Sequence, residues 1–152
     1  MKIVKKPEND VIIFNGVAWD RSNLIVSGQA HFTHEEAVEL VKQQGKRLPT
    51  RKDINTLQAL FRVEDADLKG MWFAESIKLL KTNKSLFLPF LGYKCSNEFI
   101  IDNEGKSFYF WGSEKESIRG THFYFSGVGD YLGRGNISGD YQFCIRCVQD
   151  LE

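Results

Sequence analysis

The chain lacks an excess of charge of either sign. Its 152 residues carry 20 basic and 20 acidic side chains, so the formal net charge is zero. A neutral chain has no electrostatic attraction to nucleic acid or to an anionic membrane surface, and we expect neither as a partner. Near-zero charge also does little to keep molecules apart, which favours a protein that works assembled with other copies or partners.

Long apolar runs and a cysteine framework are missing as well. No stretch approaches the length of a membrane span, and the only apolar run in the first sixteen residues is Val11–Phe14, too short for a signal peptide. We therefore expect a protein that folds in the cytoplasm without membrane insertion. The three cysteines, an odd number, cannot form a complete set of disulfides and are expected to be reduced.

Motifs for catalysis are absent too. The chain has no nucleophile elbow, phosphate loop or paired-carboxylate motif. Cys144 and Cys147 have the spacing of a zinc or redox pair, but residues three apart on a strand point to opposite faces. We therefore interpret them as small buried apolar side chains. The sequence predicts no cofactor, no metal site and no enzymatic activity.

Two helices are indicated in the first half of the chain. Thr33 and Glu36 have the spacing of a capping box, and apolar residues recur at helical spacing until Gly45, which suits a helix end. A second helix is expected to begin after Thr50, with Asp53 in its first turn. Its apolar stripe consists of Ile54, Leu57, Leu60 and Phe61.

Short strands are expected elsewhere. Residues 11–19 predict a hairpin or two short strands with a turn at Asn15-Gly16, and residues 24–26 predict another short strand. After Gly70, short apolar or alternating runs are separated by Gly, Asn, Asp and Ser, which is typical of an antiparallel meander with long loops. The runs are residues 71–73, 85–93, 99–101, 108–111, 122–125 and 143–148. We expect an arm over residues 1–10 and one α+β domain over residues 11–152.

Five motifs in this order are similar to a known family. They are Gly16-Val17-Ala18-Trp19, Arg47-Leu48-Pro49-Thr50, the stretch from Leu86 to Tyr93, Phe110-Trp111-Gly112-Ser113 and Cys144-Ile145-Arg146-Cys147-Val148. Together they resemble the C-type-lectin-like superfamily, in the branch that includes the Fibrobacter succinogenes major paralogous domain. The resemblance implies two helices packed on short antiparallel strands with long loops. The calcium-binding strings of its sugar-binding members do not occur here.

The segment from Ser113 to Tyr141 is the predicted ligand surface. Five of its glycines, Gly127, Gly129, Gly133, Gly135 and Gly139, allow close approach of the backbone among side chains that stack and form hydrogen bonds. In the family that the chain resembles, the corresponding late loops often present the ligand surface. The candidate ligand-binding residues are Trp111, Ser113, Asp130, Tyr131, Arg134, Asn136, Asp140 and Tyr141. The alternative interpretation is ordinary turns between strands, with the tyrosines half-buried.

The resemblance implies outward-facing recognition, and the missing export signal indicates assembly inside a cell. A phage virion protein satisfies both: a capsid decoration, head-fibre or tail-associated protein, assembled in the host cytoplasm. It would contact a virion protein or further copies of itself through one face, and a host surface glycan or protein through its loops. The alternatives are a lectin-like module of the bacterial cell surface, or an enzyme related to the formylglycine-generating enzymes.

Overall fold

Most of the regular structure is β-sheet. The computed structural model describes residues 10–95 and 100–151. It is 43% strand and 18% helix, with two helices and four small antiparallel sheets in the part described. The expected α+β architecture is therefore wrong, and the sheets do not clearly form the C-type-lectin-like arrangement. The short hydrogen-bonded strands after Gly70 outweigh the two brief helices. Residues 1–9 of the expected arm, and Phe99 of one expected strand, lie outside the described residues.

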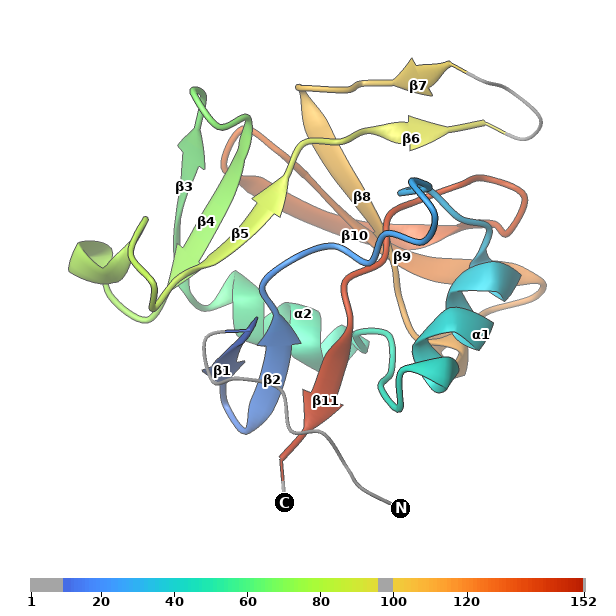
Figure 1. Cartoon of the computed structure of the whole chain (residues 1–152), viewed down its shortest axis with the longest axis horizontal. Coiled ribbons are helices and arrows are strands. Elements are labelled where there is room, and N and C mark those ends of the chain that lie inside the picture. The colour runs from blue at the N-terminus through green and yellow to red at the C-terminus, as the bar shows by residue number, and fades with distance from the viewer. Residues whose placement is uncertain (1–9, 96–99, 152) are drawn as a thin grey trace.

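The strands are arranged in sheets of two or three (Figure 1). Two three-stranded sheets contain β1 (Val11–Phe14), β2 (Val17–Asp20) and β11 (Val148–Asp150), and β3 (Phe61–Asp65), β4 (Gly70–Ala74) and β5 (Leu86–Pro89). The other two contain β8 (Ser107–Trp111), β9 (Thr121–Val128) and β10 (Tyr131–Ser138), and β6 (Tyr93–Lys94) and β7 (Ile101–Asp102). Figure 1 shows the β3–β4–β5 sheet and α1 on opposite sides of the molecule.

The helices are α1 (His34–Gln43) and α2 (Arg51–Gln58), and two single turns of 3-10 helix are η2 (Ile77–Leu79) and η3 (Glu114–Glu116). Neither α1 nor α2 has the length and apolar character needed to span a membrane, nor does any other helix in the described ranges.

Both predicted helix starts are confirmed. Thr33 caps α1 and Thr50 caps α2, and each forms a full capping box with the acidic residue three positions later. Asp53 is long enough for this role, because its Oδ2 accepts the Thr50 backbone N–H at 2.8 Å. Gly45 ends α1 at φ +68°, and the next N–H, of Lys46, bonds Val41 O at 2.9 Å.

The second helix is shorter than its apolar stripe suggested. It ends at Gln58, and Phe61 begins β3, where it pairs with Ala74 and is 48% exposed. At Phe61, pairing with β4 therefore determines the structure, although the spacing of the apolar residues suggested a helix. Residues 24–26 are not a strand either, since Val26 forms a single bridge with Gln29. The predicted hairpin at Asn15-Gly16 is confirmed, with both residues at positive φ as a tight turn requires.

The glycine-rich segment forms strands and not the long loops that we expected. Strand β10 pairs with β9 over eight residues. Of the five glycines named in the prediction, only Gly129, at the turn between these strands, has a positive φ. Gly133 and Gly135 lie within β10, where an added Cβ would approach the rings of Tyr131 and Tyr124 to 3.1 and 3.2 Å. These two glycines thus make room for aromatic rings lying across the sheet.

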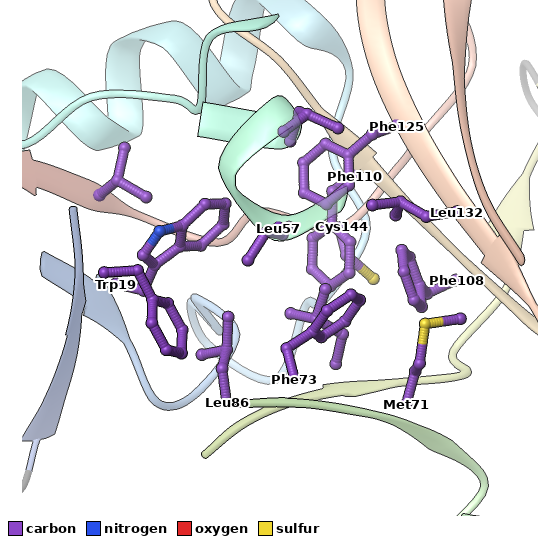
Figure 2. Close-up of a cluster of buried hydrophobic side chains, with 14 of the residues drawn as sticks. Trp19, Leu57, Met71, Phe73, Leu86, Phe108, Phe110, Phe125, Leu132 and Cys144 are labelled. Atoms are coloured by element: carbon purple, nitrogen blue, oxygen red, sulfur yellow. The ribbon is translucent and has the colours of Figure 1, made fainter. Parts of the chain in front are cut away.

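The β8–β9–β10 sheet separates two groups of buried side chains. The inner cluster, part of which is shown in Figure 2, comprises Ile12, Phe14, Trp19, Ile54, Leu57, Met71, Phe73, Leu86, Leu88, Phe90, Phe108, Phe110, Phe123, Phe125, Leu132, Cys144 and Val148. The outer cluster comprises Phe32, Ala37, Val41, Leu48, Trp111, Phe143, Ile145 and Cys147. Alternation along each strand sends successive residues to different clusters.

The last apolar segment shows the same alternation without being a regular strand. Residues 143–147 form only isolated bridges, such as Phe110 with Cys144, and the strand β11 begins at Val148. Cys144 belongs to the inner cluster and Cys147 to the outer one. The two sulfurs therefore diverge, as their spacing predicted.

Candidate functional site

The predicted ligand-binding residues do not come together at one place. Trp111 and Ser113 are buried, at 0% and 4% exposure. Trp111 stacks on Phe143 at 4.4 Å between ring centroids, and its Nε1 donates to Phe32 O at 2.6 Å. These contacts make Trp111 part of the outer cluster and leave its polar atom no role toward a ligand.

Arg134 and Asn136 point to the side of the sheet opposite to that of the tyrosines. Arg134 pairs with Phe125 of the inner face, and its guanidinium donates to Asn55 Oδ1 on α2. Asn136 Nδ2 donates to the Glu116 carbonyl at 3.3 Å. Both side chains thus connect β10 to neighbouring elements.

Asp130, Tyr131, Asp140 and Tyr141 lie toward the two ends of β10. Asp130 is in the β9–β10 turn, where its carbonyl accepts from Arg62 Nε at 2.5 Å. Tyr131 follows and is 66% exposed. Asp140 and Tyr141 come after the other end of the strand, and Tyr141 is half-buried.

All five tyrosines of the chain gather on the outer side of the β8–β9–β10 sheet. Tyr109 and Tyr124 alternate with inner-cluster phenylalanines on β8 and β9, and Tyr131 has the same alternation as Gly133 and Gly135 on β10. We call this surface the tyrosine face; it comprises Tyr93, Tyr109, Tyr124, Tyr131 and Tyr141 with Ser126, Gly133 and Gly135.

Four of these tyrosines pack around one buried ring. Phe143 lies 5.3 to 6.2 Å, between centroids, from Tyr93, Tyr109, Tyr124 and Tyr141. Tyr93 and Tyr109 are 4.7 Å apart. Rings this close are in contact with each other, so they leave no space between them for a ligand. The tyrosine face is thus a packed aromatic platform, and a ligand would lie over it.

The phenols of Tyr93 and Tyr124 keep their protons at neutral pH. Burial raises the pKa of Tyr93, and the nearby Cys95 and Asp102 raise it further. Burial also raises the pKa of Tyr124, with a contribution from Tyr109. Each hydroxyl can therefore donate and accept hydrogen bonds.

Polar groups lie at the margin of the platform. Asn103 Nδ2 donates to the Tyr109 hydroxyl at 3.4 Å. Asp102, on β7, pairs with Tyr93 and accepts from Cys95 Sγ at 3.5 Å. The combination of aromatic rings with amide and carboxylate groups suits a ligand that has both apolar faces and hydroxyl groups.

Sequence reasoning missed three members of the platform: Tyr93, Tyr109 and Tyr124. The signal was present, because Tyr109 lies between Phe108 and Phe110, and Tyr124 between Phe123 and Phe125. Period-two alternation places each tyrosine on the face opposite to its phenylalanine neighbours. Glycine content drew most of the prediction to residues in and around β10.

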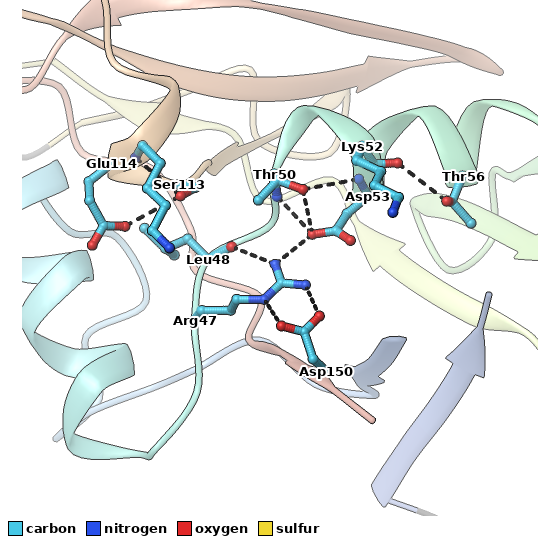
Figure 3. Close-up of polar contacts among 10 residues, drawn as sticks. Arg47, Leu48, Thr50, Lys52, Asp53, Thr56, Ser113, Glu114 and Asp150 are labelled. Carbon is cyan, nitrogen blue, oxygen red and sulfur yellow. Dashed lines mark hydrogen bonds and ion pairs between the residues drawn. The ribbon is translucent and has the colours of Figure 1, made fainter. Parts of the chain in front are cut away.

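A second polar assembly joins the start of α2 to β11 (Figure 3). Arg47 forms a two-pronged contact with Asp150, at 3.1 and 2.6 Å, and its Nη1 donates to Asp53 Oδ2 at 2.7 Å. These carboxylates raise the pKa of Arg47 although burial opposes them. Because Asp53 also closes the capping box, this assembly fixes the helix start to the last strand.

Three cavities lie beside α2. One of about 570 Å³ lies between the β1–β2 turn and α2, with Phe14 and Leu60 among its apolar lining and Lys52 and Glu75 among its polar lining. Two smaller cavities, of about 350 and 320 Å³, share Arg47, Thr50 and Asp150 in their linings. All three are within the size range of small-molecule sites.

Buried titratable groups serve the packing. Arg146 is 1% exposed, and burial lowers its pKa to about 10; its guanidinium donates to Asn23 Oδ1 and the Asp20 carbonyl. Burial raises the pKa of Cys144 to about 12, so its thiolate is scarce at neutral pH. Within residues 10–95 and 100–151, no group of three His, Cys, Asp or Glu side chains is arranged to hold a metal ion.

Comparison of the chain with family models, curated proteins and solved structures gives no match.

Proposed function

We propose that the protein is a binding module that recognises a saccharide through the tyrosine face. The observation that carries the proposal is the gathering of all five tyrosines on one side of one sheet, four of them around Phe143. Tyrosine rings offer an apolar surface for the C–H faces of a sugar ring, and their hydroxyls bond its polar edge. Asp102 and Asn103 add acceptors and donors at the margin.

Features of the face limit the cost of binding. Mutual ring contacts hold the tyrosines in place, so little side-chain freedom is lost when a ligand arrives. Gly133 and Gly135 carry no side chain that would rise above the platform. An extended chain of several sugar units would cover such a flat surface better than one unit, since no pocket between the rings encloses a ligand.

The sequence predicted a host surface glycan or protein as the ligand, and we keep the glycan as the proposed class. The phage virion and bacterial surface assignments stay predictions, because neither the sheet nor its tyrosines bear on where the module resides. The alternative of an enzyme related to formylglycine-generating enzymes also stays a prediction. The raised pKa of Cys144 does not favour thiolate chemistry at that residue.

A glycan array followed by calorimetry with the best ligand tests the proposal. Tyr124→Ala and Tyr109→Ala should each weaken binding by about 2 kcal/mol or more, the range of central aromatic contacts. Arg134→Ala is the matched control on the same hairpin, because its side chain points away to Asn55, and its affinity should equal that of the wild type.

Equal affinity of Tyr124→Ala and wild type, with both folded, would remove the tyrosine face from recognition. If no glycan on the array binds, and the protein instead captures a protein partner in a way that requires Tyr124, the saccharide proposal is wrong. The ligand of the tyrosine face would then be a protein. If Arg134→Ala loses binding and Tyr124→Ala does not, the binding site lies on the opposite face of the sheet.

A further inference from the structure

A cavity of about 350 Å³ lies away from the tyrosine face, where four parts of the chain meet. The C-terminal end of α1, the corner that precedes α2, the start of η3 and the end of β11 surround it. Its lining consists of Val41, Lys42, Lys46, Arg47, Thr50, Ser113, Glu114, Lys115 and Asp150. Figure 3 shows several of these residues around the Arg47 contacts.

Positive charge prevails in this cavity. Lys42, Lys46, Arg47 and Lys115 line it, against Glu114 and Asp150. Two of the cations are already engaged, because Lys46 Nζ lies 2.8 Å from Asp20 and Arg47 is held by Asp53 and Asp150. Lys42 and Lys115 have no ion pair or side-chain hydrogen bond with any described residue. Two exposed ammonium groups are therefore available to a ligand.

Two hydroxyl groups line the same space, and both have partners within the protein. Ser113 is 4% exposed; its Oγ accepts the Lys115 backbone N–H at 3.2 Å and donates to Glu114 Oε1 at 3.4 Å. The Thr50 hydroxyl caps α2 and donates to Asp53 Oδ2 at 3.1 Å, so the N-terminal end of that helix adjoins the cavity. A helix N-terminus favours a negatively charged group. The buried hydroxyl, the helix end and the lysines come from separate segments and line one space.

We propose that this cavity binds a small organic molecule through a phosphate or sulfate group. Lysine ammonium groups act as point charges for such anions, and Lys42 would approach from α1 and Lys115 from η3. The remaining volume accommodates a body about the size of a hexose. Asp150 competes with the ligand, since its carboxylate occupies Arg47 and lines the cavity.

Titration calorimetry at low ionic strength, with nuclear magnetic resonance of backbone amides, tests the site. The probes are inorganic phosphate, inorganic sulfate, glucose 6-phosphate and unmodified glucose. Both inorganic anions and the ester should bind, glucose should not, and the amides of Thr50, Ser113 and Lys115 should shift. Tighter binding of glucose 6-phosphate would assign the site to an ester; equal binding would assign it to the free anion.

The double variant Lys42→Gln/Lys115→Gln should weaken phosphate binding by about tenfold or more, because it removes both available charges. Its matched control is Lys78→Gln/Lys84→Gln, which changes the net charge equally at exposed lysines elsewhere. Asp150→Asn should tighten binding by freeing Arg47. Circular dichroism and thermal unfolding of each variant establish that it is folded.

The proposal fails if no anion binds the wild type at millimolar concentration, or if the shifted amides lie elsewhere. It also fails if the control variant loses as much affinity as the Lys42/Lys115 variant, because binding would then follow overall charge. These readouts do not involve the tyrosine face, so the proposed saccharide recognition stands or falls separately.

Discussion

Alternate residues of the same three strands form the two faces of the β8–β9–β10 sheet, yet the faces differ in chemistry. The inner face carries Phe108, Phe110, Phe123 and Phe125, all fully buried. The outer face carries Tyr109 and Tyr124 at the neighbouring positions, both half-buried. One added hydroxyl per ring thus distinguishes the side packed against α2 and the β3–β4–β5 sheet from the side that reaches solvent.

The difference shows how a single sheet can provide both stability and a surface. Fully buried phenylalanines contribute through the apolar area that they remove from water. Half-buried tyrosines contribute less of this area but keep a polar group and a ring edge accessible. We expect substitutions on the inner face to affect mainly folding, and substitutions on the outer face to affect mainly binding.

The largest effect should come from truncating paired rings. Phe125→Ala should lower the free energy of unfolding by about 3–5 kcal/mol, the usual cost of removing a buried phenylalanine. Phe125 contacts Phe110 at 5.3 Å between ring centroids, so a cavity would open in the inner cluster. Tyr124→Ala, one position away, should cost about 1–2 kcal/mol, because its ring is half-exposed. Urea unfolding of both variants gives the comparison, and equal losses would contradict it.

Two glycines give a smaller contrast. A Cβ at Gly127 would lie 2.4 Å from two Phe108 ring atoms, whereas a Cβ at Gly135 would lie 3.2 Å from the half-exposed Tyr124 ring. Gly127→Ala should therefore cost about 1–3 kcal/mol through overpacking. Gly135→Ala should stay within about 0.5 kcal/mol, since the tyrosine ring can move outward. Thermal unfolding measures both. A greater loss for Gly135→Ala would show that the outer face is the more rigidly packed one.

Local signals in the sequence predicted those parts of the fold that short segments determine by themselves. The capping box at Thr33, the helix start at Thr50, the glycine end at Gly45 and the turn at Asn15-Gly16 are confirmed, because each depends on bonds within a few residues. The length of α2 was mispredicted because Phe61 begins β3 and pairs with Ala74 of β4. No property of residues 51–61 alone carries that information.

The site illustrates the same limit. Tyr131 and Tyr141 were predicted and lie on the tyrosine face, but Arg134 belongs to the opposite side of the strand. Glycine usually indicates a flexible turn, and at Gly133 and Gly135 it instead accommodates neighbouring rings. Recognising this required knowing which strand lies beside β10.

A still smaller effect should appear on acidification, and mainly on the outer side. His34 contacts Trp111 at 5.1 Å and stacks on His122 at 3.9 Å, between ring centroids. Burial lowers the pKa of His34 below its ordinary value of 6.5. The bond to the Gly112 carbonyl and the charge of Glu114 oppose this shift, and His122 adds to it. Burial likewise lowers the pKa of His31, where Lys94 adds to the lowering and Glu104 opposes it.

The sign follows from proton uptake. Below pH 6.5 the unfolded chain binds protons that the folded chain does not, so stability is full above this pH and falls as the pH decreases. Each histidine contributes at most about 1.4 kcal/mol per pH unit. The Trp111 indole resonance should respond before that of Trp19, which lies in the inner cluster. His34→Gln should reduce the slope; an unchanged slope would exclude His34 as its source.

The least perturbing comparison uses the cysteines as native reporters. Cys144 and Cys147 are each 1% exposed and lie in the inner and outer clusters, whereas Cys95 is half-buried. A disulfide reagent active at acidic pH should modify Cys95 first at pH 7, and the other two only when the structure opens. If acid loosens the outer cluster first, Cys147 should react before Cys144 at pH 5.5, as mass spectrometry of digested protein would show. A thiol reagent added to the unfolded, unreduced protein should titrate three thiols; a lower count would reveal a disulfide. Simultaneous reaction of Cys144 and Cys147 would mean that the two clusters open together, so that the faces differ in chemistry but not in stability.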